Sequence, residues 1–272
     1  MSITVAALNL YPVKGLSAQP LERVPLAVGE GLPQDRRFAI THGASTFDPA
    51  APEWRPKTNY LALVRDEKLA TLQAEYDPDT AMLVLNRAGK PVSRGRIDTP
   101  TGRMLIEQFL AAYMKEATVP GPFKIVEAPG LAFTDIPDKA VSLLNLASVR
   151  DIERITRAPI DPLRFRANLH LDGLEPWAEM DWVGRRLRLI GADAGDGADS
   201  VELEVFKTTT RCAATEVNPA TAERDINMVK ALKSGFGHAI CGVYARVVRP
   251  GTVSVGDGVV VGAAPADAGV PG

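Results

Sequence analysis

The pattern of hydrophobic and polar positions predicts a protein built mostly from short β-strands. The apolar, β-branched run Ile3–Leu10 stops at a Tyr-Pro pair, as a strand does. Between 201 and 206, apolar and acidic residues alternate with the period of a half-buried strand. Similar runs predict strands at 36–41, 61–64, 71–74, 82–86, 91–94, 123–128, 169–171, 186–190, 240–248 and 253–261.

Helical periodicity is confined to three segments, at 103–115, 148–157 and 226–233. In the second, we expect Ser148 to be the N-cap and Asp151 to lie in the first turn, where the helix dipole favours a carboxylate. Many short strands with few helices favour a mainly β fold with helical inserts (α+β). A Rossmann sheet would need regular alternation of strands and helices.

The segment TVPGP, at 118–122, interrupts both periodicities and is the best candidate for a domain boundary. The 272 residues are enough for two ordinary domains. We therefore expect one domain at 1–119 and a second at 120–262. The small, proline-rich stretch 263–272 is expected to be a flexible tail.

The composition is that of an ordinary globular protein, with a net charge of −2, and gives no reason to expect nucleic-acid or membrane partners. The N-terminus lacks the features of a signal peptide, and no apolar run is long enough to span a membrane. We therefore expect a cytoplasmic protein. The motifs GxGxxG after a strand, HExxH, GxSxG and the P-loop are all missing from the sequence.

Cys212, one of two cysteines, follows the sequence KTTTR. A neighbouring guanidinium favours the thiolate, the form that reacts and binds metals. An inert, buried cysteine is equally compatible with the local sequence. Strict alternation along the preceding strand would place Arg211 and Cys212 on opposite faces. If both contact one ligand, the strand must end or bulge within 208–211. Cys241 lies in an apolar strand pattern and is expected to be a packed core thiol.

Several distant segments together resemble proteins with a MOSC domain, which is named after the C-terminal part of molybdenum cofactor sulfurases. The family's cysteine motif is similar to TTTRCAATEVNPATAERD, its middle segment to FRANLHLDGLEPWAEMDWVGRRLRLIG, and its closing strands to CGVYARVVRPGTVSVGDGVVV. The β-barrel domain that precedes MOSC in two-domain members resembles LNLYPVKGLSAQPLERVPLAVGEGLPQDRRFAI. The resemblance implies an N-terminal β-barrel-like domain over 1–119 and a MOSC β-barrel domain over 120–262.

In members such as the mitochondrial amidoxime-reducing components, the cysteine of this motif binds the molybdenum of a pterin cofactor. The resemblance implies that Cys212 is the metal ligand and the catalytic residue, and a soft thiolate suits such a metal. It also implies that cationic and planar side chains hold the phosphate and pterin of molybdopterin. The positions that it assigns to the cofactor are Lys14, Arg36, Ser148, Arg166, Asn168 and Arg211. Gly15 departs from the pattern, because many relatives carry serine there.

The activity implied by the resemblance is reduction of N-oxygenated, for example N-hydroxylated, small molecules by a molybdenum-dependent oxidoreductase. Two cysteines cannot supply a four-cysteine iron–sulfur cluster, so a separate ferredoxin- or cytochrome-type protein is expected to donate the electrons. Two alternatives stay open. The protein could carry sulfur as a persulfide on Cys212, or it could bind the molybdenum cofactor without catalysis.

Overall fold

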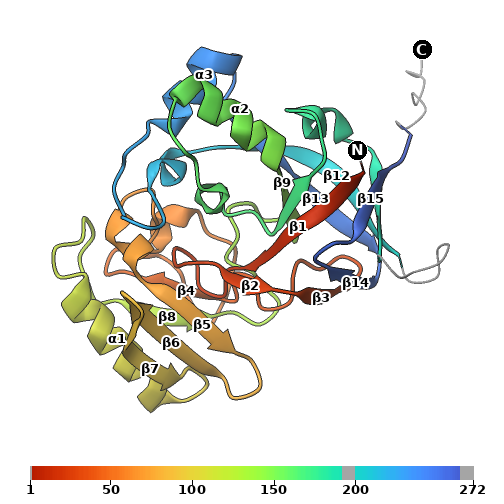
Figure 1. Ribbon diagram of the computed structural model, residues 1–272. Coiled ribbons are helices and arrows are strands. Elements are labelled where there is room, and N and C mark those ends of the chain that lie inside the picture. Colours follow the sequence, from red (N-terminus) through yellow and green to blue (C-terminus); the bar gives the residue numbers. More distant parts are fainter. Residues whose placement is uncertain (1, 192–199, 264–272) are drawn as a thin grey trace, which may run out of the picture.

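The computed structural model describes residues 2–191 and 200–263. Its largest sheet closes into a β-barrel (Figure 1). Seven strands follow one another in the order β10, β9, β13, β12, β11, β15 and β1, and β1 closes the ring by pairing with β10. Only the β9–β10 pair in this ring is parallel. The strands are β1 (Ile3–Leu10), β9 (Val141–Asn145), β10 (Leu169–Asp172), β11 (Arg186–Ile190), β12 (Val201–Thr210), β13 (Ile240–Arg249) and β15 (Gly258–Val261).

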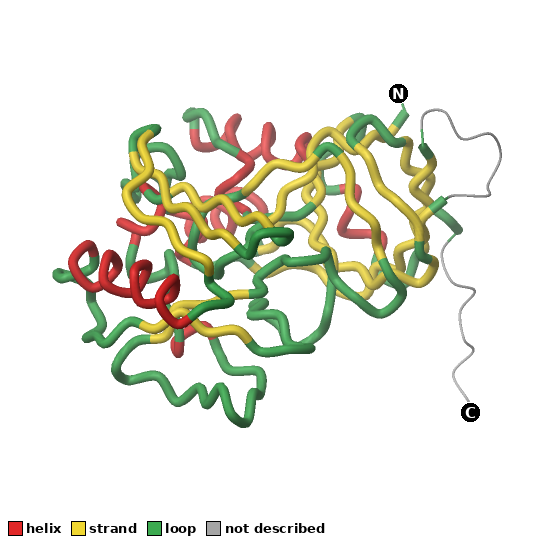
Figure 2. Tube along the Cα trace, turned by 90° about the horizontal axis from the view of Figure 1, so that it is seen from below, coloured by secondary structure: helices red, strands yellow, loops and turns green. Residues whose placement is uncertain are grey.

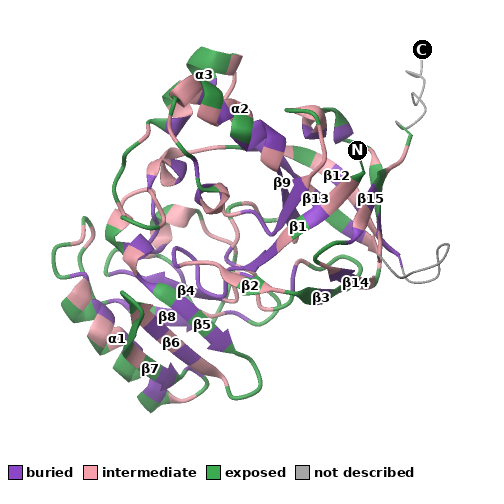
Figure 3. Cartoon of the chain, viewed as in Figure 1, coloured by how far each residue is buried: buried purple, intermediate pink, exposed green. Residues whose placement is uncertain are grey.

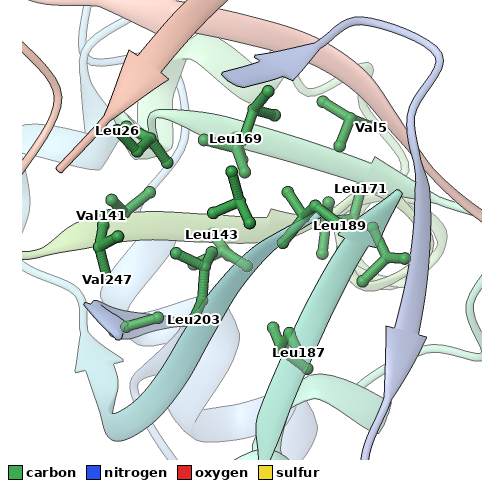
Figure 4. Close-up of a cluster of buried hydrophobic side chains, with 14 of the residues drawn as sticks. Val5, Leu26, Val141, Leu143, Leu169, Leu171, Leu187, Leu189, Leu203 and Val247 are labelled. Carbon is green, nitrogen blue, oxygen red and sulfur yellow. The ribbon is translucent and has the colours of Figure 1, made fainter. Parts of the chain in front are cut away.

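Alternating apolar residues fill the inside of this barrel (Figure 4). Val201, Leu203 and Val205 of β12 are fully buried, whereas Glu202 and Glu204 between them are partly exposed. Leu187 and Leu189 of β11 reach the same core. The period-2 pattern therefore accounts for the inward face of β12, since burial of apolar surface is the main driving force for folding.

The N-terminal half forms smaller sheets beside the barrel (Figure 2). An antiparallel three-stranded sheet packs against a helix, and Ile106 and Leu110 of that helix meet Leu83 and Leu85 in a second core. A barrel-like arrangement is expected for this half. The structure instead has one two-stranded and one three-stranded sheet, and the helix packs into the core that they share. The elements are β4 (Phe38–Thr41) paired with β8 (Lys124–Glu127), then β5 (Gln73–Asp77), β6 (Met82–Arg87), β7 (Lys90–Arg96) and α1 (Pro100–Tyr113).

Two further helices, α2 (Leu146–Thr156) and α3 (Met228–Phe236), lie together on one side of the barrel (Figure 1). Their buried residues form a separate apolar cluster with Cys241, and Figure 3 shows the purple, buried face of α2 turned inward. The remaining strands are short: β2 (Gln19–Leu21) pairs with β1, and β3 (Arg23–Leu26) pairs with β14 (Gly251–Ser254). In the described residues, no helix is both long and apolar enough to cross a membrane.

The mainly β fold class expected from the sequence is confirmed, while several segments differ in detail. The segment 61–64 is wrong as a strand, because it runs through turns and pairs with no strand. The segment 253–261 is two strands, separated by a turn at Gly256 with φ +94°. The pattern analysis missed β9, which is a short apolar run that continues directly into α2.

The strand pairings qualify the expected division at residue 119. β1 belongs to residues 1–119 but completes the barrel that residues after 120 otherwise build. The division into domains at 1–119 and 120–262 stays a prediction. β1 belongs to the first of these segments in sequence but pairs with strands of the second. Of the expected tail 263–272, all but residue 263 lies outside the described residues.

We expect Leu203→Ala to lower the free energy of unfolding by about 3 kcal/mol, because the fully buried side chain leaves a cavity in the barrel core. Leu105→Ala is the control, since Leu105 of α1 is 46% exposed and should cost well under 1 kcal/mol. Urea unfolding of both variants measures the difference, and equal losses would contradict this account of the core.

Candidate functional site

A cavity of about 260 Å³ lies where the barrel meets the N-terminal half of the chain. Its wall combines loop residues of the N-terminal half with the end of β12 and with Tyr244 of β13. The structure brings together six of the seven predicted site residues in this wall: Lys14, Arg36, Arg166, Asn168, Arg211 and Cys212. Only Ser148 lies elsewhere.

Cys212 is presented by an irregular end of β12. The strand has a bulge between Thr208 and Thr210 and ends at Thr210, so the predicted end or bulge within 208–211 is confirmed. The chain then makes a tight turn, in which the backbone N–H and the hydroxyl of Thr215 both donate to the carbonyl of Cys212, at 3.0 and 2.8 Å. Bulges of this kind re-aim side chains beside functional sites. The break in alternation therefore lets Arg211 and Cys212 line the same cavity.

Lys57 is the cation that contacts the thiol. Its Nζ lies 3.2 Å from Sγ of Cys212 and 3.9 Å from a carboxylate oxygen of Asp135. Burial lowers the pKa of Lys57, but Asp135 and the Cys212 thiolate raise it more, so its pKa lies above the ordinary value. The lysine is therefore an ammonium at neutral pH, and its positive charge lies beside the sulfur.

An ion pair between a buried lysine and a half-exposed aspartate forms another part of the cavity wall. Nζ of Lys14 donates to Asp135 at 2.5 Å and to the carbonyl of Phe133 at 2.9 Å. Burial lowers the pKa of Lys14, whose side chain is only 7% exposed. Burial also raises the pKa of Asp135, but Lys14 and Lys57 outweigh it and hold that pKa well below its usual range. Asp135 therefore offsets part of the cost of burying the Lys14 ammonium.

Two arginines lie against the ring of Tyr11. The guanidinium carbons of Arg36 and Arg166 lie 4.5 and 4.4 Å from the ring centroid, the geometry of cation–π contacts. Arg36 also pairs with Asp35 and donates to the carbonyl of Arg166 at 2.8 Å. Burial lowers the pKa of Arg166 to about 10, so it stays charged at neutral pH.

Both arginines have left-handed backbones, with φ of +47° at Arg36 and +53° at Arg166. This conformation is unfavourable for a residue with a side chain and persists where the surrounding structure enforces it. The carbonyl of Arg36 accepts from Phe133, and Arg166 caps the short helix Pro162–Phe165. Gly15 has the related constraint of φ +86°, and a Cβ there would lie 2.8 Å from the carbonyl oxygen of Leu61. The backbone geometry thus explains why glycine replaces serine.

Arg211 is held by the main chain and keeps one donor unused. Its Nε and Nη1 donate to the carbonyls of Cys241 and Phe165, both at 2.7 Å. Its Nη2 is buried without a hydrogen-bond partner in the described part of the chain, and so is the hydroxyl of Thr209. Leaving such a group unpaired costs about 1–3 kcal/mol. An acceptor bound in the cavity would remove that cost.

Asn168 lines the cavity, but its polar atoms are already engaged. Its Oδ1 accepts from the backbone and hydroxyl of Ser142, at 3.1 and 2.7 Å, and its Nδ2 donates to the carbonyl of Asn9 at 3.2 Å. The residue is 1% exposed. Asn168 therefore ties β1 to β9 and shapes the wall from behind.

Ser148 has a different position from the one expected. The N-cap of α2 is Asn145, whose side chain accepts from the backbone of Ala147, so the capping prediction is wrong. Ser148 is fully buried in the first turn, donates to the carboxylate of Glu179 at 3.0 Å and accepts from the backbone of Trp177. Glu179 thus supplies the anion that this helix N-terminus favours. The structure gives no support to Ser148 as a cofactor residue.

Pattern analysis missed Lys57 and Asp135, although both lie beside predicted residues. They belong to the loop segments EWRPKTN and FTDIPDK, which have no periodicity. Only the tertiary fold carries them to Cys212 and Lys14. The predicted cation Lys14 could have prompted a search for a carboxylate partner. Several loops contain an acidic residue, so the sequence alone does not identify Asp135 as that partner.

We expect Asp135→Asn to lower the free energy of unfolding at pH 7 by about 1–2 kcal/mol, because it leaves Lys14 buried without its counterion. The half-exposed carboxylate limits the effect. A depressed folded pKa stabilises the fold above the unfolded value of about 3.9 and loses this contribution as the pH falls below it. The difference from wild type should therefore shrink between pH 7 and pH 3 in urea unfolding. An unchanged difference would contradict the assignment.

We expect Lys57→Met to slow alkylation of the free Cys212 thiol by iodoacetamide at pH 7 by about fivefold, because the thiolate loses its ammonium partner. Lys57→Arg keeps the charge and should react at nearly the wild-type rate. Cys241 is fully buried and serves as the unreactive internal reference in peptide mass spectrometry. Equal rates for the Met and Arg variants would overturn the role given to Lys57.

Comparison with known proteins is consistent with the predicted resemblance. Human mitochondrial amidoxime-reducing component 1 is 23% identical over 293 residues, which cover 93% of this chain and 81% of the human protein. Among solved structures, the YUAD protein of Bacillus subtilis aligns over 96% of both chains, with 12% identity and a TM-score of 0.45. YiiM of Geobacillus stearothermophilus covers 45% of this chain and 54% of its own, with 18% identity and a TM-score of 0.34. The family model described as "MOSC domain" matches residues 130–260, the part of the chain that contains Cys212.

Proposed function

We propose that the cavity binds a molybdenum cofactor and that the protein uses it to reduce N-oxygenated small molecules. One observation carries the proposal: among the described residues, the Cys212 thiol shares a cavity with seven cationic side chains and two carboxylates, in a chain whose net charge is −2. A thiolate beside clustered cations suits a sulfur-bound metal that comes with a phosphate-bearing organic group. The similarity to an amidoxime-reducing component supports the substrate class.

The residues of the cavity wall suit both the metal and the phosphate of such a cofactor. Cys212 is partly exposed and Nζ of Lys57 lies 3.2 Å from its sulfur, so it can supply the metal ligand. Lys14, Arg36 and Arg166 would bind the phosphate, since guanidinium groups match phosphate oxygens and lysine adds a point charge. The unused Nη2 of Arg211 and the hydroxyl of Thr209 would satisfy polar atoms of the organic part.

These positions suggest which steps the cofactor would perform and which the side chains would perform. When bound, the cofactor would supply the two-electron chemistry that removes oxygen from an N–O group. The chain would anchor it through Cys212, neutralise its phosphate with the buried cations and keep Lys57 charged beside the sulfur. The strained backbones of Arg36 and Arg166 fix those cations before binding, which lowers the cost of ordering them.

Electrons must then come from another molecule. We propose a ferredoxin- or cytochrome-type donor protein, because the two cysteines of this chain, of which Cys241 is fully buried, cannot hold an iron–sulfur cluster. A reducing compartment such as the cytoplasm would keep Cys212 free to bind the metal.

A second candidate is a sulfur carrier, and the Lys57–Cys212 contact favours it, since a partly exposed thiolate can also accept sulfur as a persulfide. Incubation with a cysteine desulfurase and mass spectrometry of the Cys212 peptide tests this function. Added sulfur that passes on to an acceptor would favour the carrier over the reductase. A cofactor-loaded protein that never turns over an N-hydroxylated compound would favour plain cofactor binding.

We expect wild-type protein from a host that makes the cofactor to contain about one molybdenum per chain, with a single thiolate anchor. Cys212→Ser should lose at least about nine-tenths of it, because an alcohol is a poor ligand for a soft metal. Ser148→Ala is the matched control and should keep its molybdenum, since Ser148 lies outside the cavity.

Elemental analysis by mass spectrometry, together with benzamidoxime reduction by a chemical reductant, measures both properties. Wild-type protein without molybdenum, or equal loading of the Cys212→Ser variant, would refute the proposal.

A further inference from the structure

The cationic side chains of the cavity are not equivalent, because most already have partners. The partnered ones donate to carboxylates, main-chain carbonyls or the thiol, and they are Lys14, Arg36, Lys57, Arg164, Arg166 and Arg211. The seventh is Lys207. Its side chain makes no hydrogen bond or ion pair with any other residue of the described segments 2–191 and 200–263.

Lys207 occupies a particular place on the wall. It lies in β12 opposite Tyr244, with one register shift directly before it and another two residues later. It is exposed, whereas the side chains of Lys14 and Arg36 are 7% and 14% exposed. The cavity wall therefore combines buried cations that already have partners with one exposed cation that has none among the described residues.

The buried cations and the exposed cation suit two different kinds of anion. A phosphate that stays bound needs desolvated, pre-positioned donors, and the inner cations provide them. An exposed ammonium without a protein partner instead attracts anions that bind reversibly, because the other cations of the wall add to its positive field. Asp35 and Asp135 are the only carboxylates among the described residues that line the cavity, and Arg36 and Lys14 already neutralise them.

We infer that Lys207 is a specificity residue that selects N-oxygenated substrates bearing a carboxylate. The inference rests on the proposed function and narrows its substrate class. A substrate whose N–O group points toward Cys212 would place its carboxylate at the ammonium of Lys207. Neutral substrates enter the same cavity without that contact.

The test compares benzamidoxime with 4-carboxybenzamidoxime, which differ only by the carboxylate. With molybdenum-loaded wild type and a chemical reductant, we expect a higher kcat/KM for the carboxylate. The ratio of the two kcat/KM values should fall about three- to fivefold in Lys207→Gln, mostly through KM, as for a partly solvated ion pair. Lys207→Arg should preserve the ratio.

Lys90→Gln, which removes an equally exposed charge from the hairpin of β6 and β7, should keep the ratio within about twofold of wild type. Raising the salt concentration from about 50 to 500 mM should lower the wild-type ratio, because the Debye length shortens. A wild-type ratio insensitive to both Lys207→Gln and salt would overturn the inference.

A binding measurement separates this inference from the proposed function. Calorimetric titration of 4-carboxybenzamidoxime without reductant should show weaker affinity for Lys207→Gln than for wild type, whether or not turnover occurs. If wild type reduces neither compound, the proposed function fails. If it reduces both, and Lys207→Gln binds the carboxylate as tightly as wild type does, only the role of Lys207 fails.

Discussion

Crowding of positive charge in one cavity is the constraint on which the rest of the structure depends. Seven cationic side chains line it with two carboxylates, and like charges in a partly buried wall repel each other strongly. The fold contains this repulsion in three ways. Asp135 pairs with Lys14, the ring of Tyr11 makes cation–π contacts with Arg36 and Arg166, and main-chain carbonyls accept from Arg211. Such an arrangement is costly in a protein with no anion to bind.

The barrel makes this concentration of charge possible. Its closed ring buries an apolar core that stabilises the molecule independently of the site. The irregular end of β12 then supplies Cys212, and the loops of the N-terminal half supply the opposite wall. The candidate site therefore lies at the junction of the two halves, which β1 joins by running from one half into the barrel of the other.

Most of the elements, and six residues that line the cavity, could be predicted from the sequence because both leave signals in it. The strand Ile3–Leu10 and the strand of Arg186–Ile190 follow from apolar periodicity alone, and Cys212 follows from a motif. Lys57 and Asp135 could not be found in this way, because their contacts join residues more than a hundred positions apart. The position of Ser148 was misjudged because its buried partner, Glu179, is visible only in three dimensions.

The central proposal is that the charged cavity beside Cys212 holds a molybdenum cofactor. Anomalous diffraction at the molybdenum edge, from crystals of protein purified with its native cofactor, tests it most directly. We predict one anomalous peak at bonding distance from Sγ of Cys212, with phosphate density among Lys14, Arg36 and Arg166. A peak away from Cys212, or phosphate density at the N-terminus of α2, would contradict the account.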